Sequence, residues 1–262
     1  MAKFTQGIKL KKQLGQHFLR DQSVVDHMLS KVELNNTTSV FEIGCGDGFL
    51  TKSILQTKIA RLWIFEIDHE WAEFVKKHYP DSRMTMFETN FLDIDFKIFE
   101  ENKPWTLLAN LPYQVTFPIL KKLQQNRHLL KEGVIMVQEE VAEKILKKSG
   151  RGYGYISLFF QHYFEWVQLV KVPPTAFVPP PKVYSRLLYF KPRLITEKII
   201  NEDEFWKFIK FCFKQPRRTL KNNLQQTHFD LNKIKPDLLN LRAQQLSMND
   251  LIEIWNSLQS SS

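Results

Sequence analysis

The sequence predicts an α/β protein in which a doubly wound, mostly parallel sheet is followed by a small all-helical C-terminal domain. Three observations support this prediction. Strand-length apolar runs alternate with amphipathic stretches from about residue 38 to residue 190, two further strand-like runs flank a proline-rich connector, and strand patterns end after residue 193. With 262 residues, 43% of them hydrophobic, the chain is long enough for a large domain and a smaller one. We therefore expect domains at residues 1–193 and 194–262.

Five short apolar runs are the expected parallel strands of the sheet. They are Ser39–Ile43, Leu62–Ile67, Met84–Phe87, Trp105–Asn110 and Val134–Gln138. Between them, amphipathic stretches with helical spacing predict helices on the faces of the sheet. These stretches are Trp71–His78, Pro118–Leu123 and Glu139–Lys147.

Three later segments complete the prediction. Aromatic residues recur at helical spacing between Ile156 and Phe164, which indicates a helix with a buried face. The runs Trp166–Val172 and Ser185–Phe190 predict an antiparallel hairpin that closes one edge of the sheet. From about Glu202 onward, apolar residues follow helical periodicity, and this pattern predicts the helical domain.

The net charge favours a polyanionic partner. Lysine and arginine total 37 against 28 acidic residues, which gives a formal charge of +9 and a pI near 9.4. Neutralising phosphates releases condensed counterions, so nucleic acid is the natural partner for such a chain. A basic protein without such a partner stays an alternative. The cations gather in an N-terminal and a C-terminal segment, and the expected RNA-binding residues are Lys11, Lys12, Arg217, Arg218 and Lys221.

Several classes of protein are disfavoured by the sequence. The two cysteines, Cys45 and Cys212, have neither a disulfide pattern nor a metal-ligand spacing, so a reducing compartment fits best. There is no run of 18 apolar residues and no apolar N-terminal signal. We expect a cytoplasmic monomer with no metal and no membrane partner.

A glycine-rich loop follows the first expected strand and predicts a ligand site. Residues 42–48 read Glu-Ile-Gly-Cys-Gly-Asp-Gly, and glycines let the backbone turn tightly and approach a ligand. The next strand ends at Glu66, 22 residues after Gly44, where an acid is placed to bind ribose hydroxyls. The alternatives are a structural turn and a solvated carboxylate. Together, the loop and the acid resemble the class I methyltransferase pattern for S-adenosylmethionine. Asn90 stands where many such enzymes carry an aspartate, and its amide oxygen can accept the same hydrogen bond from the adenine amino group.

The fourth expected strand ends in Asn110-Leu111-Pro112-Tyr113, which suits chemistry on an exocyclic aromatic amine. The Asn110 side-chain oxygen and the Leu111 carbonyl can hold both amine hydrogens, Pro112 stiffens the turn, and Tyr113 can stack on the base. Methyl transfer then needs positioning and electrostatic help. An ordinary Asn-Pro turn is the alternative. Phe177, in the proline-rich connector, is either a clamp on the other face of a flipped base or a hydrophobic anchor.

The ordered set of motifs resembles the KsgA/RsmA family of ribosomal RNA adenine dimethyltransferases, from about Gln13 to Leu224. The resemblance rests on residues 15–19 (Gly-Gln-His-Phe-Leu), 42–48, 66–68, 110–113, 138–142, 177–181 and 217–220 (Arg-Arg-Thr-Leu). It implies a seven-stranded, Rossmann-like methyltransferase fold and dimethylation of N6 on two adjacent adenosines near the 3′ end of 16S RNA.

The same resemblance extends the expected cofactor site. It implies that His17 and Leu19 line the S-adenosylmethionine site with Gly44, Gly46, Glu66, Asn90 and Asn110. His17 stands where asparagine is common, and a structural histidine is the alternative.

Two other functions stay open at this point. The related family that methylates large-subunit RNA and confers macrolide resistance shares the cofactor and Asn-Pro-Tyr features, but the segment at Arg217–Leu220 favours the small-subunit enzyme. A non-catalytic ribosome assembly factor or transcription factor on the same fold would be expected to lose part of the glycine loop or acceptor turn. Both are intact here.

Overall fold

The computed structural model describes residues 4–11, 15–194 and 198–259, and these residues form two compact units. The first unit comprises the described residues of Met1–Ala142 together with Glu165–Pro192. The second comprises Glu143–Phe164 and the described residues of Arg193–Ser262. The second unit therefore includes a segment from the middle of the chain in addition to the C-terminal part.

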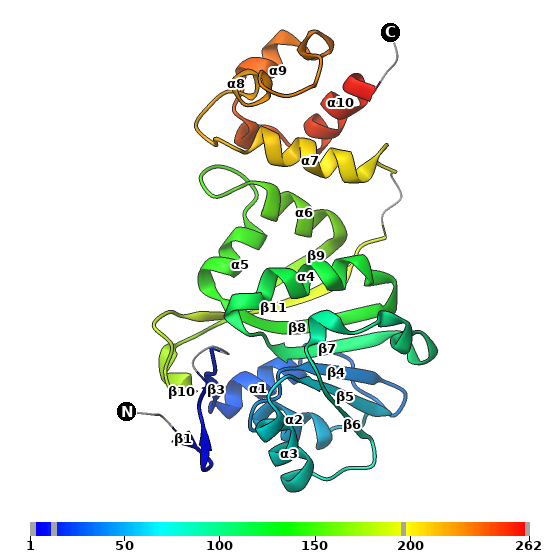
Figure 1. Cartoon of the computed structure of the whole chain (residues 1–262), viewed down its shortest axis with the longest axis vertical. Helices are drawn as coiled ribbons and strands as arrows, with labels where there is room; N and C mark the ends of the chain where they lie inside the picture. Colours follow the sequence, from blue (N-terminus) through cyan, green and yellow to red (C-terminus); the bar gives the residue numbers. More distant parts are fainter. Residues whose placement is uncertain (1–3, 12–14, 195–197, 260–262) are drawn as a thin grey trace. The chain divides into compact units, whose positions relative to one another are not determined.

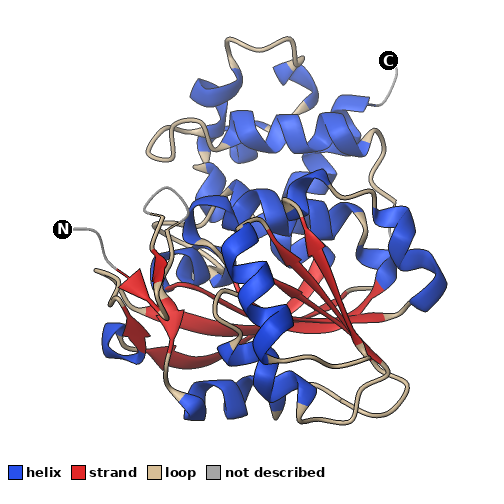
Figure 2. Ribbon diagram, turned by 60° about the horizontal axis from the view of Figure 1, so that its bottom comes forward, coloured by secondary structure: helices blue, strands red, loops and turns tan. Residues whose placement is uncertain are grey.

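A seven-stranded sheet forms the centre of the first unit (Figures 1 and 2). Its order is β6 (Met84–Glu88), β5 (Arg61–Glu66), β4 (Ser39–Ile43), β7 (Trp105–Asn110), β8 (Leu130–Gln138), β11 (Ser185–Pro192) and β9 (Phe164–Val172). The pairings among β6, β5, β4, β7 and β8 are parallel, whereas β11 runs antiparallel to β8. The predicted doubly wound, mostly parallel sheet is confirmed, and β9 and β11 are neighbours at one edge as expected.

The strand order fixes where a ligand site lies. The chain runs outward from β4 through β5 to β6, and then returns to place β7 on the other side of β4. In such sheets, ligands bind beyond the carboxyl ends of the strands where the order reverses. The loops after β4, β5, β6 and β7 are therefore the expected walls of a site.

Side-chain alternation along the strands gives the sheet two apolar faces. On one face, residues such as Val40 and Ile64 pack in a cluster with α1 (Gln22–Leu29), α2 (Phe49–Leu55) and α3 (His69–His78). On the other face, Phe41 and Phe65 belong to an aromatic cluster with Phe99, which lies on the 3-10 helix Phe96–Asn102. Both faces are thus covered, as parallel sheets require.

Further elements complete the first unit. Helix α4 (Thr116–Gln125) follows β7, and α5 (Glu139–Leu146) follows β8 and contains the boundary at which the second unit begins. Short 3-10 helices occupy Phe91–Asp93, Tyr113–Val115, Arg127–Leu129 and Pro174–Ala176. Two small antiparallel pairs were not predicted from the sequence: β1 (Phe4–Thr5) with β2 (Ile8–Lys9), and β3 (Phe18–Leu19) with β10 (Phe177–Val178). The β3–β10 pair ties the N-terminal segment to the proline-rich connector.

The second unit is helical, as expected for the C-terminal part. It contains α6 (Tyr155–Tyr163), α7 (Glu202–Cys212), α8 (Leu220–Leu224), α9 (Pro236–Asn240) and α10 (Met248–Gln259), with 3-10 turns at Leu231–Lys233 and Ala243–Gln245. The Trp206 indole donates a hydrogen bond to the Tyr163 hydroxyl at 2.7 Å, which links α7 to α6. Among the described residues, the helices of the chain are too short or too polar to cross a membrane.

Candidate active site

A cavity of about 240 Å³ lies in the first unit at the carboxyl ends of β4, β5, β6 and β7. Predicted residues from five separate stretches of sequence line it together: His17, Leu19, Gly44, Gly46, Glu66, Asn90 and Asn110–Tyr113. The topology brings these residues to one edge of the sheet, as the sequence predicted. Leu19 itself is buried in the apolar core beneath the cavity, where it contributes packing.

The glycine loop is shaped by backbone conformations that favour glycine. Gly44, Gly46 and Gly48 all have positive φ angles, of 73°, 52° and 82°. A Cβ atom added at Gly46 would lie 2.8 Å from the Phe18 ring. A side chain is thus excluded at Gly46, and the loop lines the cavity through Gly44 to Asp47.

Glu66 is fixed at the end of β5 by backbone donors. Only 6% of its surface is exposed, and its two carboxylate oxygens accept hydrogen bonds from the Gly46 N–H at 3.1 Å and the Asp68 N–H at 2.9 Å. Burial raises the pKa of this carboxyl. Oε2 also accepts the Cys45 thiol at 3.7 Å, whereas Oε1 retains acceptor capacity for a hydroxyl group, so the carboxylate fits a ribose hydroxyl at this position.

A second buried carboxyl, Glu42, also lines the cavity and was not predicted as a site residue. It is 1% exposed and accepts a hydrogen bond from the Thr51 hydroxyl at 2.7 Å. Burial, together with the nearby charge of Glu66, raises the pKa of Glu42 to about 8. The sequence signal was an acid inside an otherwise apolar strand, which is unusual unless the side chain has a specific partner.

The segment of residues 15–20, which we call the N-terminal strap, is held against the sheet edge by charged groups. Arg20 donates to both carboxylate oxygens of Asp47, at 2.5 and 3.3 Å. Just before the strap, Lys11 forms ion pairs with Asp68 at 2.5 Å and with Glu70 at 2.9 Å. The Asp68 hydrogen bond raises the pKa of Lys11. Lys11, expected to bind RNA, is therefore already neutralised by two acids, and Lys12 lies outside the described residues.

The turn after β7 presents hydrogen-bond acceptors. The Asn110 amide nitrogen donates to the His17 carbonyl at 3.4 Å, which turns the Asn110 oxygen away from the strap. The Leu111 N–H donates to the Met136 carbonyl at 3.1 Å and fixes the adjacent backbone. The Thr116 hydroxyl donates to the Pro112 carbonyl at 3.1 Å and closes the turn.

Tyr113 is anchored at both its hydroxyl and its ring. The hydroxyl is 2.7 Å from the Ser185 hydroxyl, and one face of the ring stacks on His17 with centroids 5.9 Å apart. The His17 Nδ1 atom is 2.8 Å from the Pro179 carbonyl and must donate to it, since a carbonyl only accepts. His17 therefore lines the cavity and also serves the structural role that the sequence left as its alternative.

Two predicted residues have contacts that the sequence did not indicate. The Asn90 side-chain oxygen accepts the Leu92 N–H at 3.0 Å and caps a 3-10 helix, so a hydrogen bond from the adenine amino group would use its second lone pair.

Phe177 is 2% exposed, packs in the apolar core and pairs with Leu19 across β3–β10. It does not line the cavity, and this placement matches the hydrophobic anchor rather than a clamp on a target base.

Comparison with known proteins identifies the family. The model of the family described as "Ribosomal RNA adenine dimethylase" matches residues 7–260. The chain belongs to this family. It is 34% identical over 253 residues to the Ribosomal RNA small subunit methyltransferase A of Chlorobium phaeobacteroides, covering 96% of this chain and 92% of that protein.

Two solved structures share the fold of this family member. A dimethyladenosine transferase from Plasmodium falciparum superposes with a TM-score of 0.79 at 23% identity, covering 91% of this chain and 96% of the other. The 23S rRNA methyltransferase ErmE superposes with a TM-score of 0.72 at 18% identity, covering 93% and 100%. At these identities the likeness shows the class I methyltransferase fold alone.

The family makes the chain an enzyme that uses S-adenosylmethionine, and the cavity fits that cofactor. Gly44 and Gly46 of the glycine loop line the cavity, and Glu66 offers carboxylate oxygens at the end of the next strand. Exposed Ile67, which lines the cavity, offers an apolar surface for the adenine ring of the cofactor.

The predicted C-terminal cations lie in the second unit. Arg217, Arg218 and Lys221 are exposed, and none of them forms an ion pair with a described residue. Their positive charge is therefore available to an external anion.

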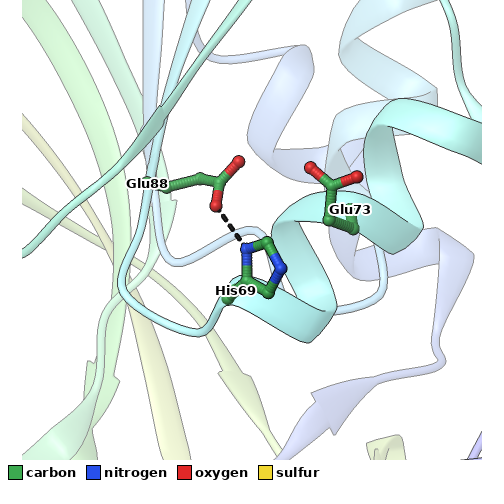
Figure 3. Close-up of side chains that lie close together, drawn as sticks. All are labelled: His69, Glu73 and Glu88. Atoms are coloured by element: carbon green, nitrogen blue, oxygen red, sulfur yellow. Dashed lines mark hydrogen bonds and ion pairs between the residues drawn. The ribbon is translucent and has the colours of Figure 1, made fainter.

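A separate cluster of His69, Glu73 and Glu88 resembles a metal site in composition (Figure 3). Its ligand atoms lie within 4.8 Å of one another on the exposed surface, and His69 contacts Glu88 at 2.6 Å. However, the Lys76 ammonium forms ion pairs with both Glu73 and Glu88. This cation neutralises the cluster, so we assign no metal to it.

Proposed function

We propose that this chain transfers methyl groups from S-adenosylmethionine to N6 of two adjacent adenosines near the 3′ end of 16S ribosomal RNA during ribosome biogenesis. The observation that carries the proposal is the turn Asn110–Tyr113, whose acceptors line the same cavity as the glycine loop and Glu66. The name of the Chlorobium relative supports the small-subunit target over the large-subunit alternative.

The residues of the turn account for the chemistry. The N6 amine of adenine is a poor nucleophile, because its lone pair is delocalised into the ring. The Asn110 oxygen and the Leu111 carbonyl accept its two hydrogens and favour a pyramidal nitrogen with a localised lone pair. Tyr113, held by Ser185 and His17, stacks on the base with its free face. S-adenosylmethionine, when bound, supplies the methyl group.

We assign different roles to the two parts of the chain. The first unit binds the cofactor and the target base, and residues 194–262 bind RNA through Arg217, Arg218 and Lys221. Within this proposal the partner is the immature small ribosomal subunit, and the protein acts as a cytoplasmic monomer without a metal.

The test is incubation of purified protein with radiolabelled S-adenosylmethionine and undermethylated small ribosomal subunits, with large subunits in parallel. We expect label in small-subunit RNA, and roughly 10²–10³-fold slower labelling with Asn110→Ala. Label in large-subunit RNA alone would support the macrolide-resistance type of enzyme. Subunit binding without transfer to either RNA would support a non-catalytic assembly factor.

A further inference from the structure

A buried asparagine side chain makes several hydrogen bonds to the backbone of a basic turn in the second unit. The turn spans Lys214–Lys221 and carries the exposed cations Lys214, Arg217, Arg218 and Lys221. Asn223, only 8% exposed, lies in α8, the short helix that begins within the turn at Leu220. The cations themselves are on the solvent side.

Asn223 uses both ends of its amide to fix the backbone of this turn. Its oxygen accepts the Gln215 N–H at 2.9 Å. Its nitrogen lies 3.2 Å from the Gln215 carbonyl, 3.4 Å from the Arg218 carbonyl and 3.2 Å from the Thr219 carbonyl. One side chain therefore sets the backbone at both ends of the stretch that carries Arg217 and Arg218.

A distant segment brings another cation to the same place. Thr219 forms an isolated antiparallel bridge with Arg242, and the Leu220 N–H donates to the Leu241 carbonyl at 2.7 Å. Residues paired across such a bridge project to the same side. The exposed side chain of Arg242 thus lies beside the turn, although 23 residues separate it from Thr219 in sequence.

The local charge balance favours a polyanion at this surface. Between Lys214 and Arg242 the sequence holds seven lysines and arginines against two aspartates. None of Arg217, Arg218, Lys221 and Arg242 is ion-paired with another described residue. Exposed cations on a fixed backbone match the regularly spaced phosphates of an RNA strand.

We propose that Asn223 is a positioning residue that holds the Lys214–Lys221 turn in its RNA-binding conformation, and that Arg242 contacts RNA phosphate on the same surface. This inference rests on the proposed function, since it takes ribosomal RNA as the ligand. Its physical basis is preorganisation. A backbone that is already fixed loses less conformational freedom when its arginines bind, so affinity rises without additional contacts.

The experiment on Asn223 is a double-mutant cycle, with binding to undermethylated small ribosomal subunits measured at several salt concentrations. Asn223→Ala should weaken binding by about tenfold. In a background that carries Arg217→Gln and Arg218→Gln, the same change should weaken binding less than about twofold, because the arginines that it positions are gone. Asn223→Asp, which places a carboxylate against three carbonyls, should behave like Asn223→Ala. Equal losses in both backgrounds, or no loss in the first, would overturn the positioning role.

The experiment on Arg242 tests the contact itself. Arg242→Gln should weaken binding several-fold and lower the slope of log K against log salt by about 1, the change expected for one lost phosphate contact. Arg242→Lys, which keeps the charge, should stay near wild type. The control is Lys207→Gln, which removes one charge from an exposed residue of the same unit that is already paired with Glu204. An Arg242→Gln variant indistinguishable from this control would overturn the assignment.

Two further measurements distinguish a failure of this inference from a failure of the proposed function. Binding of S-adenosylhomocysteine should be unchanged in every variant, which reports that the first unit is intact. If wild type does not methylate small-subunit RNA, the proposed function fails. If wild type methylates it and the variants bind it normally, only this inference fails.

Discussion

Replacing Glu42 by glutamine should remove a large part of the pH dependence of folding stability. The glutamine has nearly the same shape and can still accept the hydrogen bond that the Thr51 hydroxyl donates to Glu42 at 2.7 Å. It cannot ionise. The variant therefore changes the charge of the buried group while preserving its packing.

The magnitude follows from the raised pKa of Glu42. Burial moves this pKa from 4.5 to about 8, which at ~1.4 kcal/mol per pKa unit corresponds to roughly 5 kcal/mol. Because the folded-state pKa lies above the unfolded-state value, the folded protein holds the proton more tightly. The contribution of protonated Glu42 to the free energy of unfolding is thus fully present below pH ~4.5 and is lost as the pH rises toward about 8. Over that window the free energy of unfolding should fall by ~1.4 kcal/mol per pH unit because of this group alone.

The assay is urea unfolding of wild type and Glu42→Gln at pH 5, 6, 7 and 8 without cofactor. We expect the difference in unfolding free energy to shift in favour of the variant by several kcal/mol between the lowest and the highest pH. Glu66, whose pKa is also raised, supplies a residual dependence common to both proteins. Parallel curves for the two proteins would refute the reasoning, since they would mean that Glu42 titrates normally.

Four further substitutions, at three residues, test the site and its support. Asn110→Ala should lower methyl transfer by roughly 10²–10³-fold with little loss of RNA binding, because one preorganised hydrogen-bonding group is lost; a near-normal rate in a single-turnover assay contradicts the acceptor role. Tyr113→Phe, which loses only the hydrogen bond to Ser185, should keep transfer within a few-fold, whereas Tyr113→Ala should lose ~1–3 kcal/mol of base binding; equal effects in steady-state kinetics count against stacking. Phe177→Ala should lower the free energy of unfolding by ~3–5 kcal/mol in urea titrations, as for a buried anchor; a loss of transfer at unchanged stability points instead to a clamp.

The sheet was predictable because its signals are local. Runs such as Ser39–Ile43 and Trp105–Asn110 have strand length and are mostly apolar, and the structure gives the same bounds. Strand ends in a parallel sheet meet at one edge, so the acids and amides that follow them were expected to converge. The cavity lining confirms that Glu66, Asn90 and Asn110 do so.

The features that the sequence did not predict depend on contacts between residues far apart in sequence. The sequence predicts Lys11 to be a free cation, but in the structure it pairs with Asp68, which is 57 residues away. Phe177 stands in the proline-rich connector, where the sequence left both a base clamp and a hydrophobic anchor open, and only its pairing with Leu19 shows that it is buried. The segment 143–164 continues the strand–helix alternation in sequence, and only its packing assigns it to the second unit.

The measurement that tests the central claim most directly is mass spectrometry of small-subunit RNA after reaction with the purified protein and S-adenosylmethionine. The account predicts N6,N6-dimethyladenosine at two adjacent positions near the 3′ end, and roughly 10²–10³-fold slower modification with Asn110→Ala. Monomethylated adenosine as the final product, or modification at other nucleotides, would contradict it.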